Sequence, residues 1–175
     1  PTHKLIDSSF KNWRGMTDSG GRRIKRAIYI DISTIRFWDE ELLRRFQKFD
    51  LLQDYLESKL KEFDISNQTV GENLDQIIKG RRFTNIGTFR AYIKAFLKNH
   101  SDIHDKMTFL IRQLPPGEKG LPMEIYVFTK DTDWVRYESI QSDIFDHLMA
   151  IVSEFDLKVF QNPSGNDFKS IARSK

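Results

Sequence analysis

Two histidines near the middle of the chain have the spacing of metal ligands. His100 and His104 are four residues apart, which places two imidazoles on one face of a helix, and Asp102 and Asp105 lie beside them. A zinc site needs a further ligand held in position and hydrogen bonds that orient the rings. The helical pattern ends near His100, so the shared face is interrupted there. We therefore interpret these residues as polar surface groups at a helix end and predict no metal site.

Other catalytic patterns are missing from the sequence. It contains no cysteine, which excludes disulfides, thiolate zinc sites, iron–sulfur clusters and a cysteine nucleophile. Neither H-E-x-x-H nor G-x-S-x-G occurs. The run Gly117-Glu118-Lys119-Gly120 has the glycines of a phosphate loop, but it lacks the Gly-Lys-Ser/Thr ending and joins two predicted strands. We interpret it as a hairpin loop, and we predict no enzyme activity, no catalytic residue and no cofactor.

Basic and aromatic residues form a third pattern, that of an RNA-binding sheet, in which cations bind phosphates and flat rings stack on bases. The sequence offers two basic clusters and four aromatic residues in predicted strands: Arg22, Arg23, Lys25 and Arg26; Arg81 and Arg82; Tyr29, Tyr126, Phe128 and Phe160. The RNA-recognition consensus is absent, and Glu124 places a negative charge in the strand that would carry it. We interpret the aromatic face as packed on another domain or subunit, because uncovered apolar surface is a liability for a monomer.

The composition bounds the class of protein. The 175 residues are 39% hydrophobic and 13% aromatic, which is enough for a core, and the length fits one domain. The 28 Lys and Arg against 25 Asp and Glu give a net charge of +3, which permits acidic partners without specifying one. No run approaches the roughly 20 apolar residues that cross a bilayer.

The elements that would position these residues alternate between strands and helices. Residues 22–32 form the first predicted strand, in which alternate isoleucines share one face and Arg26 interrupts it. Asp39 is the predicted N-cap of a helix over 39–63, with two glutamates in its first turn. The later predicted elements are a helix from Thr88, hairpin strands at 107–114 and 123–129, a helix over 133–155 capped by Asp131 or Thr132, and a short strand at 157–160.

This order predicts an α+β fold of the ferredoxin-like βαββαβ type, with an insertion over about 64–87 between the first helix and the second strand. We expect a four-stranded mixed sheet with helices 39–63 and 133–155 on the same face. The reason is that each helix has one apolar stripe, which it must bury on the sheet.

Several blocks of sequence together resemble a known family. They are residues 8–16, 19–26, 80–92, 121–129 and 160–167. They are similar to the C-terminal cytoplasmic region of the MscS-like mechanosensitive ion channels, specifically the miniconductance (YbdG-type) branch. The similarity covers nearly all of residues 3–168. Shorter members of the family lack much of residues 64–90, so that stretch departs from the general pattern and suits this branch.

The resemblance implies a domain organisation. Residues 1–15 would be the last part of a truncated middle β (Sm-like) domain, residues 16–21 a linker, residues 22–162 the ferredoxin-like α/β domain and residues 163–175 a flexible tail. The positions that match the family signature are Asn12, Trp13, Gly20, Gly21, Arg22, Arg23, Gly80, Arg81, Arg82, Gly87, Pro163 and Gly165. The membrane helices would lie upstream of Pro1, so no pore-lining residue is carried over.

The resemblance also implies a function. Chains of this family form a homo-oligomeric ring, typically a heptamer, whose cytoplasmic parts enclose a vestibule with side portals. The intact protein would be an integral membrane protein of the bacterial inner membrane with this region on its cytoplasmic side. It would open under membrane tension and release ions and small solutes in hypo-osmotic shock, with no nucleic-acid partner. Two alternatives stay open, a ferredoxin-like RNA-binding module and a small-ligand regulatory module.

Overall fold

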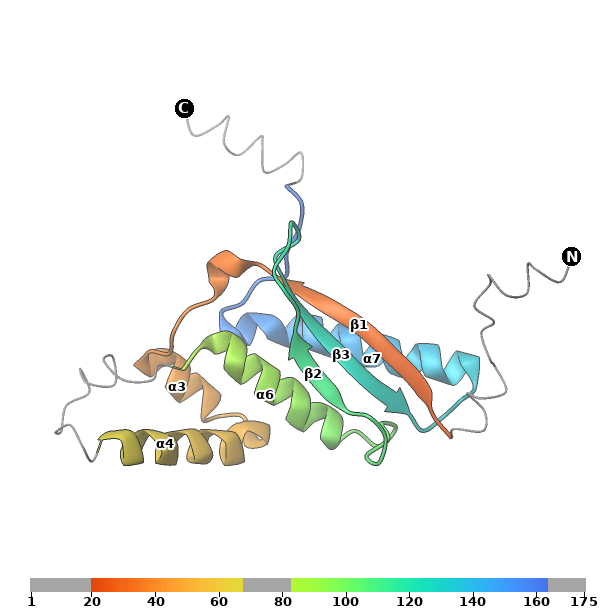
Figure 1. Cartoon of the computed structure of the whole chain (residues 1–175), viewed down its shortest axis with the longest axis horizontal. Coiled ribbons are helices and arrows are strands. Elements are labelled where there is room, and N and C mark those ends of the chain that lie inside the picture. Colours follow the sequence, from red (N-terminus) through yellow and green to blue (C-terminus); the bar gives the residue numbers. More distant parts are fainter. Residues whose placement is uncertain (1–19, 68–82, 164–175) are drawn as a thin grey trace, which may run out of the picture.

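The computed structural model describes residues 20–67 and 83–163, and its elements alternate as the sequence predicts (Figure 1). The strands are β1 (Arg22–Ile30), β2 (Leu110–Gln113) and β3 (Leu121–Thr129). They form one sheet in the order β1-β3-β2. The α+β class is confirmed.

The pairing of the strands differs from the expectation of a mixed sheet. Both β1 and β2 run antiparallel to β3, so the described sheet is antiparallel throughout, and the prediction of a mixed sheet is wrong. The predicted fourth strand is reduced to an isolated bridge between Ile30 and Val159. Two hydrogen bonds hold it, from Asp31 N to Lys158 O and from Phe160 N to Tyr29 O, each 2.8 Å long. The prediction of a four-stranded sheet is therefore also wrong within the described residues.

The predicted helix over 39–63 is two helices with a break. Helix α3 spans Glu40–Phe46, a 3₁₀ turn η2 spans Asp50–Leu52, and α4 spans Gln53–Asn67. Asp39 caps α3 as predicted, because its side chain accepts a hydrogen bond from Leu42 N at 2.9 Å. Phe49 has an extended backbone, which interrupts the helix. The periodic stripe hid this break, since residues on both sides of it are buried.

The remaining helices begin at caps that sequence analysis placed slightly wrongly. Helix α6 spans Asn85–Lys98 and is capped by Thr84 rather than beginning at Thr88. Helix α7 spans Trp134–Ile151, is followed by the 3₁₀ turn η3 (Val152–Phe155), and is capped by Asp133. Asp131 instead accepts a hydrogen bond from Asp133 N at 2.8 Å, so it supports the capping residue.

The helices reach the sheet in a different pairing from the one expected. Helix α7 contacts β1 and lies behind the strands in Figure 1, and α6 contacts β2. The turn η2 packs on α6, so the 39–63 segment extends the helical side of the molecule outward from α6. The expectation that this segment accompanies α7 on the sheet is wrong, and α6 takes that place.

Aromatic rings fill the junction of these elements. The Phe155 ring lies 5.3 Å from Phe46, 5.1 Å from Phe89 and 5.4 Å from Tyr92, measured between centroids. Phe46, Phe89 and Phe155 are fully buried. Aromatic pairs at these separations add to the stabilisation from burial alone. Helix α3, helix α6 and the turn η3 after α7 therefore meet at one point of the core.

Candidate interaction face

The sheet has one face buried under helices and one open face. Side chains alternate along a strand, and directly paired residues share a face. We use the term open sheet face for Arg23, Lys25, Ala27 and Tyr29 of β1, Leu110 and Arg112 of β2, and Pro122, Glu124, Tyr126 and Phe128 of β3. Tyr29 and Leu110 are 41% and 40% exposed, whereas Ile24, Ile28 and Ile125 on the opposite face are buried. Three of the four predicted aromatic residues are thus on one face, and Phe160 lies beside Tyr29 at the sheet margin.

The open sheet face carries an ion pair between neighbouring strands. Arg112 Nη2 lies 2.7 Å from Glu124 Oε1, and Arg112 Nε donates to the same oxygen at 2.8 Å. The residues face each other in the β2–β3 register, and Glu124 is 6% exposed. Glu124, the acidic residue that does not fit the RNA-binding pattern, is therefore buried and paired with Arg112. A buried carboxylate of this kind is stabilised by its partner and is strongly destabilising without it.

Aromatic rings and cations complete the open sheet face. The Tyr126 and Phe128 rings lie 5.8 Å apart in an edge-to-face arrangement, and the Arg23 guanidinium lies 5.7 Å from the Tyr126 ring centre. Lys25 is exposed beside them and pairs with Tyr126 in the sheet register. The surface therefore offers flat apolar area with positive charge at one side, which suits packing on another polypeptide.

The basic cluster of β1 is divided between the two faces of the sheet. The Arg22 guanidinium lies 4.1 Å from the Trp134 ring centre and 4.6 Å from that of Tyr137, and Arg26 lies 4.3 Å from the Phe145 ring centre. The contact with Phe145 explains how Arg26 is accommodated in an otherwise apolar row of β1, because guanidinium groups stack favourably on aromatic faces. Arg81 and Arg82, the second predicted cluster, lie outside the described residues.

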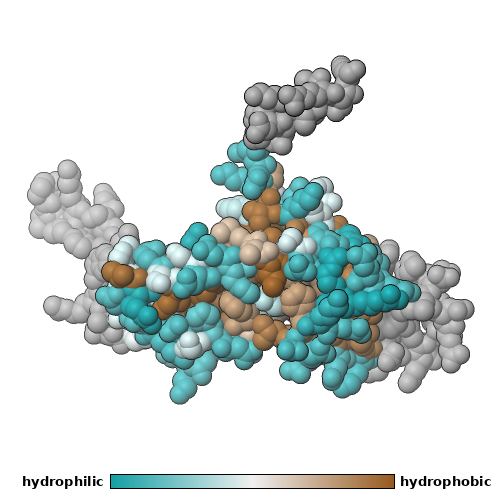
Figure 2. Space-filling view, turned by 180° about the vertical axis from the view of Figure 1, so that it is seen from behind, coloured by the Kyte–Doolittle hydropathy of each residue, from teal (hydrophilic) through white to brown (hydrophobic). Residues whose placement is uncertain are grey.

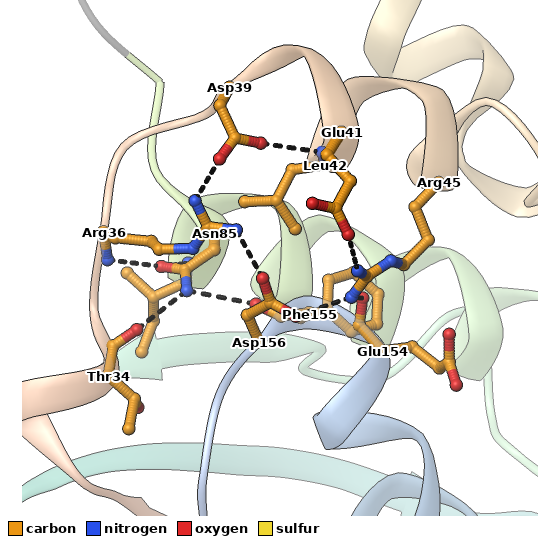
Figure 3. A network of polar contacts seen from close by, with 11 residues as sticks. Thr34, Arg36, Asp39, Glu41, Leu42, Arg45, Asn85, Glu154, Phe155 and Asp156 are labelled. Atoms are coloured by element: carbon orange, nitrogen blue, oxygen red, sulfur yellow. Dashed lines mark hydrogen bonds and ion pairs between the residues drawn. The ribbon is translucent and has the colours of Figure 1, made fainter.

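A buried asparagine positions the elements behind the sheet (Figure 3). The Asn85 amide donates to Thr34 O at 2.9 Å and to Phe155 O at 3.0 Å, and its side-chain oxygen accepts from Arg36 N at 3.0 Å. Asn85 is fully buried, and all three partners come from other parts of the chain. A buried amide needs such partners, because an unpaired one is costly. Asn85 therefore joins the start of α6 to the segment after β1 and to the turn η3 that follows α7.

Asp156 closes the same network with charge (Figure 3). Its carboxylate pairs with Arg36 and, at 2.5 Å, with Arg45 Nη1, and Arg36 also pairs with Asp39. Hydrogen bonding from Arg36, followed by that from Arg45, lowers the pKa of Asp156 below its ordinary value. The pKa of Asp39 is lowered chiefly by the backbone hydrogen bond from Leu42. The backbone of Asp156 is left-handed with φ of 52°, a conformation that Asp tolerates better than most residues.

Several signature positions have a structural reason. Gly20 has a φ of +68°, and a Cβ on Gly21 would lie 2.6 Å from Met107 Sδ and 3.1 Å from Thr129 O. Gly87 N donates to the Thr84 hydroxyl that caps α6. Arg22 and Arg23 lie on β1, on opposite faces, and Pro163 is exposed at the end of the described chain. The remaining positions lie outside the described residues: Asn12, Trp13, Gly80, Arg81, Arg82 and Gly165.

The histidine pair is not brought together on a helix. Helix α6 ends at Lys98, before both residues. The Nδ1 atom of His100 accepts from Asp102 N, and that of His104 accepts from Lys106 N, each at 3.2 Å, so each ring closes its own turn. Over residues 20–67 and 83–163, no group of three or more His, Asp or Glu side chains is arranged to hold a metal ion. In the same ranges, no helix has the length and apolar character of a membrane span.

Sequence reasoning missed the Asn85 and Asp156 network. The available signal was an amide next to Ile86, between Phe83 and Phe89, where an unpaired polar group would be unfavourable if those neighbours were buried. The partners Arg36, Arg45 and Asp156 are distant in sequence and follow no periodic pattern, so nothing local pointed to them.

The comparison with protein families matches the second half of the described chain, which includes Asn85 and Asp156 but not their partners Thr34, Arg36 and Arg45. Residues 83–159 match the family described as "Mechanosensitive ion channel MscS, C-terminal". The match begins just before α6, includes the β2–β3 hairpin and α7, and ends at the Val159 bridge. This region of the chain is therefore similar to the C-terminal domain of MscS mechanosensitive channels.

Proposed function

We propose that the chain is the cytoplasmic vestibule domain of an MscS-like mechanosensitive channel of the miniconductance (YbdG-type) branch. The intact channel opens under membrane tension and releases ions and small solutes during hypo-osmotic shock. The observation that carries the proposal is the match of residues 83–159, because this region supplies two of the three strands and both helices that contact the sheet. The α+β class and the Gly20-Gly21 turn support it.

The proposed domain organisation follows from the same similarity. Residues 22–162 form the α/β domain, of ferredoxin-like type, and residues 1–15 are the end of a preceding Sm-like β domain. The β1-β3-β2 order, with the Val159 bridge on the outer side of β1, is compatible with βαββαβ connectivity. The proposal places this domain on the cytoplasmic side of the inner membrane.

The open sheet face is the proposed surface for assembly. A ring uses a heterologous interface, in which two different patches of neighbouring copies meet. The open sheet face offers aromatic area, a paired buried carboxylate and exposed cations in one plane. In the proposed ring, typically a heptamer in this family, this face packs against the neighbouring copy or against the preceding β domain. The role is mechanical, with no reaction catalysed and no cofactor bound.

The test is electrical recording from the full-length protein. Patches from bacterial spheroplasts that express it should show pressure-activated currents, and the variant Tyr126→Glu should reduce them because it places charge in the proposed interface. The matched control is Lys119→Glu, at the exposed hairpin tip. Absence of a pressure-activated conductance in patches that contain the wild-type protein would refute the proposed function.

An RNA-binding module is the second candidate, favoured by Arg23 lying over Tyr126 on the open sheet face. An RNA-binding sheet would lose affinity steeply with salt, because its cations displace counterions from phosphates. We expect no complex between this chain and labelled single-stranded RNA at physiological ionic strength. Sub-micromolar binding under those conditions would place the RNA-binding module first.

A further inference from the structure

Strand β1 is at the outer edge of the sheet, and its backbone shows which groups face outward. Tyr29 O and Asp31 N bond to the 158–160 segment, and Arg23 O accepts a hydrogen bond from the Tyr137 hydroxyl at 3.0 Å. Both groups of one residue in an antiparallel strand point to the same side. The odd-numbered residues of β1 therefore direct their N–H and C=O away from β3.

The middle of this edge is unpaired. Over the described residues, no hydrogen bond reaches the outward N–H or C=O of Lys25 or Ala27. We call this stretch, from Arg23 to Tyr29, the β1 edge. Unpaired strand groups of this kind are a template for another extended chain. The edge is closed at both ends, by Tyr137 and by Phe160, so the open part accommodates a short segment.

The charge around the β1 edge selects the partner. Arg23 and Lys25 project on the open sheet face, and Arg22 and Arg26 project on the α7 side. A second copy pairing through its own β1 would bring these like charges together, which is unfavourable. Side chains of an added strand would meet cations on both of its faces, so carboxylates suit either face. Trp134, which is 54% exposed beside Arg22, offers apolar contact at the same end.

We propose that the β1 edge binds an acidic, extended peptide segment by strand addition. The backbone of Lys25 and Ala27 pairs with the added strand, and Arg23, Lys25 and Arg26 face its carboxylates. Nucleic acid lacks the regularly spaced N–H and C=O groups that this backbone edge matches. The inference is independent of the channel function, because it rests only on the edge and the charge of β1.

The binding test uses the whole chain and a defined probe. The probe is a fluorescent peptide of about eight residues that alternates Glu and Val, a length suited to one strand. Its anisotropy should rise on titration with the protein, and an otherwise identical peptide that alternates Lys and Val should bind at least about tenfold more weakly. Equal binding of the two peptides would overturn the acidic specificity, and no binding of the Glu peptide would overturn the proposal.

A proline variant tests strand addition itself. Ala27→Pro removes an outward N–H that the β1–β3 ladder does not use, and proline is tolerated at edge positions of this kind. We expect it to weaken the Glu peptide about tenfold, since hydrogen bonds of the added strand are lost. The control Ala27→Val keeps the N–H and should bind like the wild type. Unchanged binding by a folded Ala27→Pro protein would overturn the backbone pairing.

Hydrogen exchange provides a readout that needs no variant. In the wild-type chain saturated with the Glu peptide, exchange of the Lys25 and Ala27 amides should slow about tenfold, as expected for newly formed strand hydrogen bonds. Amide exchange that stays unchanged on saturation would show that the peptide binds by charge alone, which contradicts the proposal. Tighter binding of labelled single-stranded RNA than of the Glu peptide would make the basic residues of β1 a nucleic-acid site. That result would also contradict the proposal.

Discussion

The network around Asn85 and the open sheet face differ in how far their side chains and backbone groups are satisfied within the chain. Asn85 is fully buried with its partners inside the chain, and Asp156 is paired with two arginines. On the open sheet face Arg112 and Glu124 are paired, but Tyr29 and Leu110 remain exposed. Within the described part of the chain, the outward backbone groups of Lys25 and Ala27 have no hydrogen bond. A network that is satisfied internally fixes the fold, whereas a surface with unused contacts is suited to a partner. We therefore assign stability to the first region and assembly to the second.

The largest effect is expected for Asn85→Ala. The change removes an amide that contacts two other segments of the chain, and it leaves Thr34 O, Arg36 N and Phe155 O without that partner. The free energy of unfolding should fall by about 3 kcal/mol, because buried groups lose their partners together. Urea unfolding of the chain measures it.

Asn99→Ala is the matched control, because Asn99 lies exposed at the other end of the same helix. Its cost should stay below about 1 kcal/mol. Equal losses for the two variants would mean that Asn85 does not join the segments as described.

A smaller effect is expected for Asp156→Asn. Asparagine tolerates the left-handed backbone, so the change isolates the charge. At neutral pH it should cost about 1 kcal/mol, since the arginine pairs are partly exposed to solvent. Asp143→Asn, on the exposed side of α7, is the control for the same chemical change.

The same carboxylate makes stability depend on pH. Its pKa in the folded chain is lowered from the ordinary 3.8, so its contribution is complete above that value and is lost as pH falls through the lower folded pKa. Asp156→Asn should therefore reduce the loss of stability on acidification below about pH 4. Unfolding curves at neutral and acidic pH measure the slope, and a slope identical to that of the wild type would contradict the assigned pair.

The smallest effect on folding is expected on the open sheet face. Tyr29→Ser should change the free energy of unfolding by no more than about 0.5 kcal/mol, because Tyr29 is 41% exposed and lies outside the buried core. A loss of several kcal/mol would show that Tyr29 belongs to the fold itself.

The chain alone should also assemble weakly. It contains only part of the proposed ring contacts, and association must first offset several kcal/mol of lost freedom. Light scattering at micromolar concentration should give a monomer or a weak small oligomer. A persistent heptamer would show that the α/β domain encodes the ring by itself.

Local patterns predicted the elements better than their pairing. Alternation located β1, and the Asp39 cap and the Gly117–Gly120 hairpin follow from short-range chemistry. The break at Phe49 escaped notice because buried residues continue the same spacing across it. Strand direction and the choice of α6 as the second helix on the sheet depend on contacts between distant segments, which periodicity does not encode.

The open sheet face was partly predictable, because it follows from the local alternation of side chains along each strand. Alternation placed Tyr29, Tyr126 and Phe128 on one face, and the register confirms this for these three. Alternation also divides the basic cluster of β1 between the two faces of the sheet. Only the structure shows that Arg22 and Arg26 stack on aromatic rings of α7. The asparagine network required the three-dimensional structure.

Figure 2 adds that, on the side behind the sheet, hydrophobic surface gathers in the middle with hydrophilic surface at both ends.

Protection of the open sheet face in the assembled protein tests the central claim most directly. The chain has no native cysteine, so Tyr29→Cys introduces a single reactive thiol into it. In the 175-residue chain this thiol should react readily with a maleimide, as should the control Lys119→Cys at the hairpin tip. In full-length protein in native membranes, we predict that Tyr29→Cys becomes protected while Lys119→Cys stays reactive. Equal labelling of both positions in the membrane protein would contradict the role of the open sheet face in assembly.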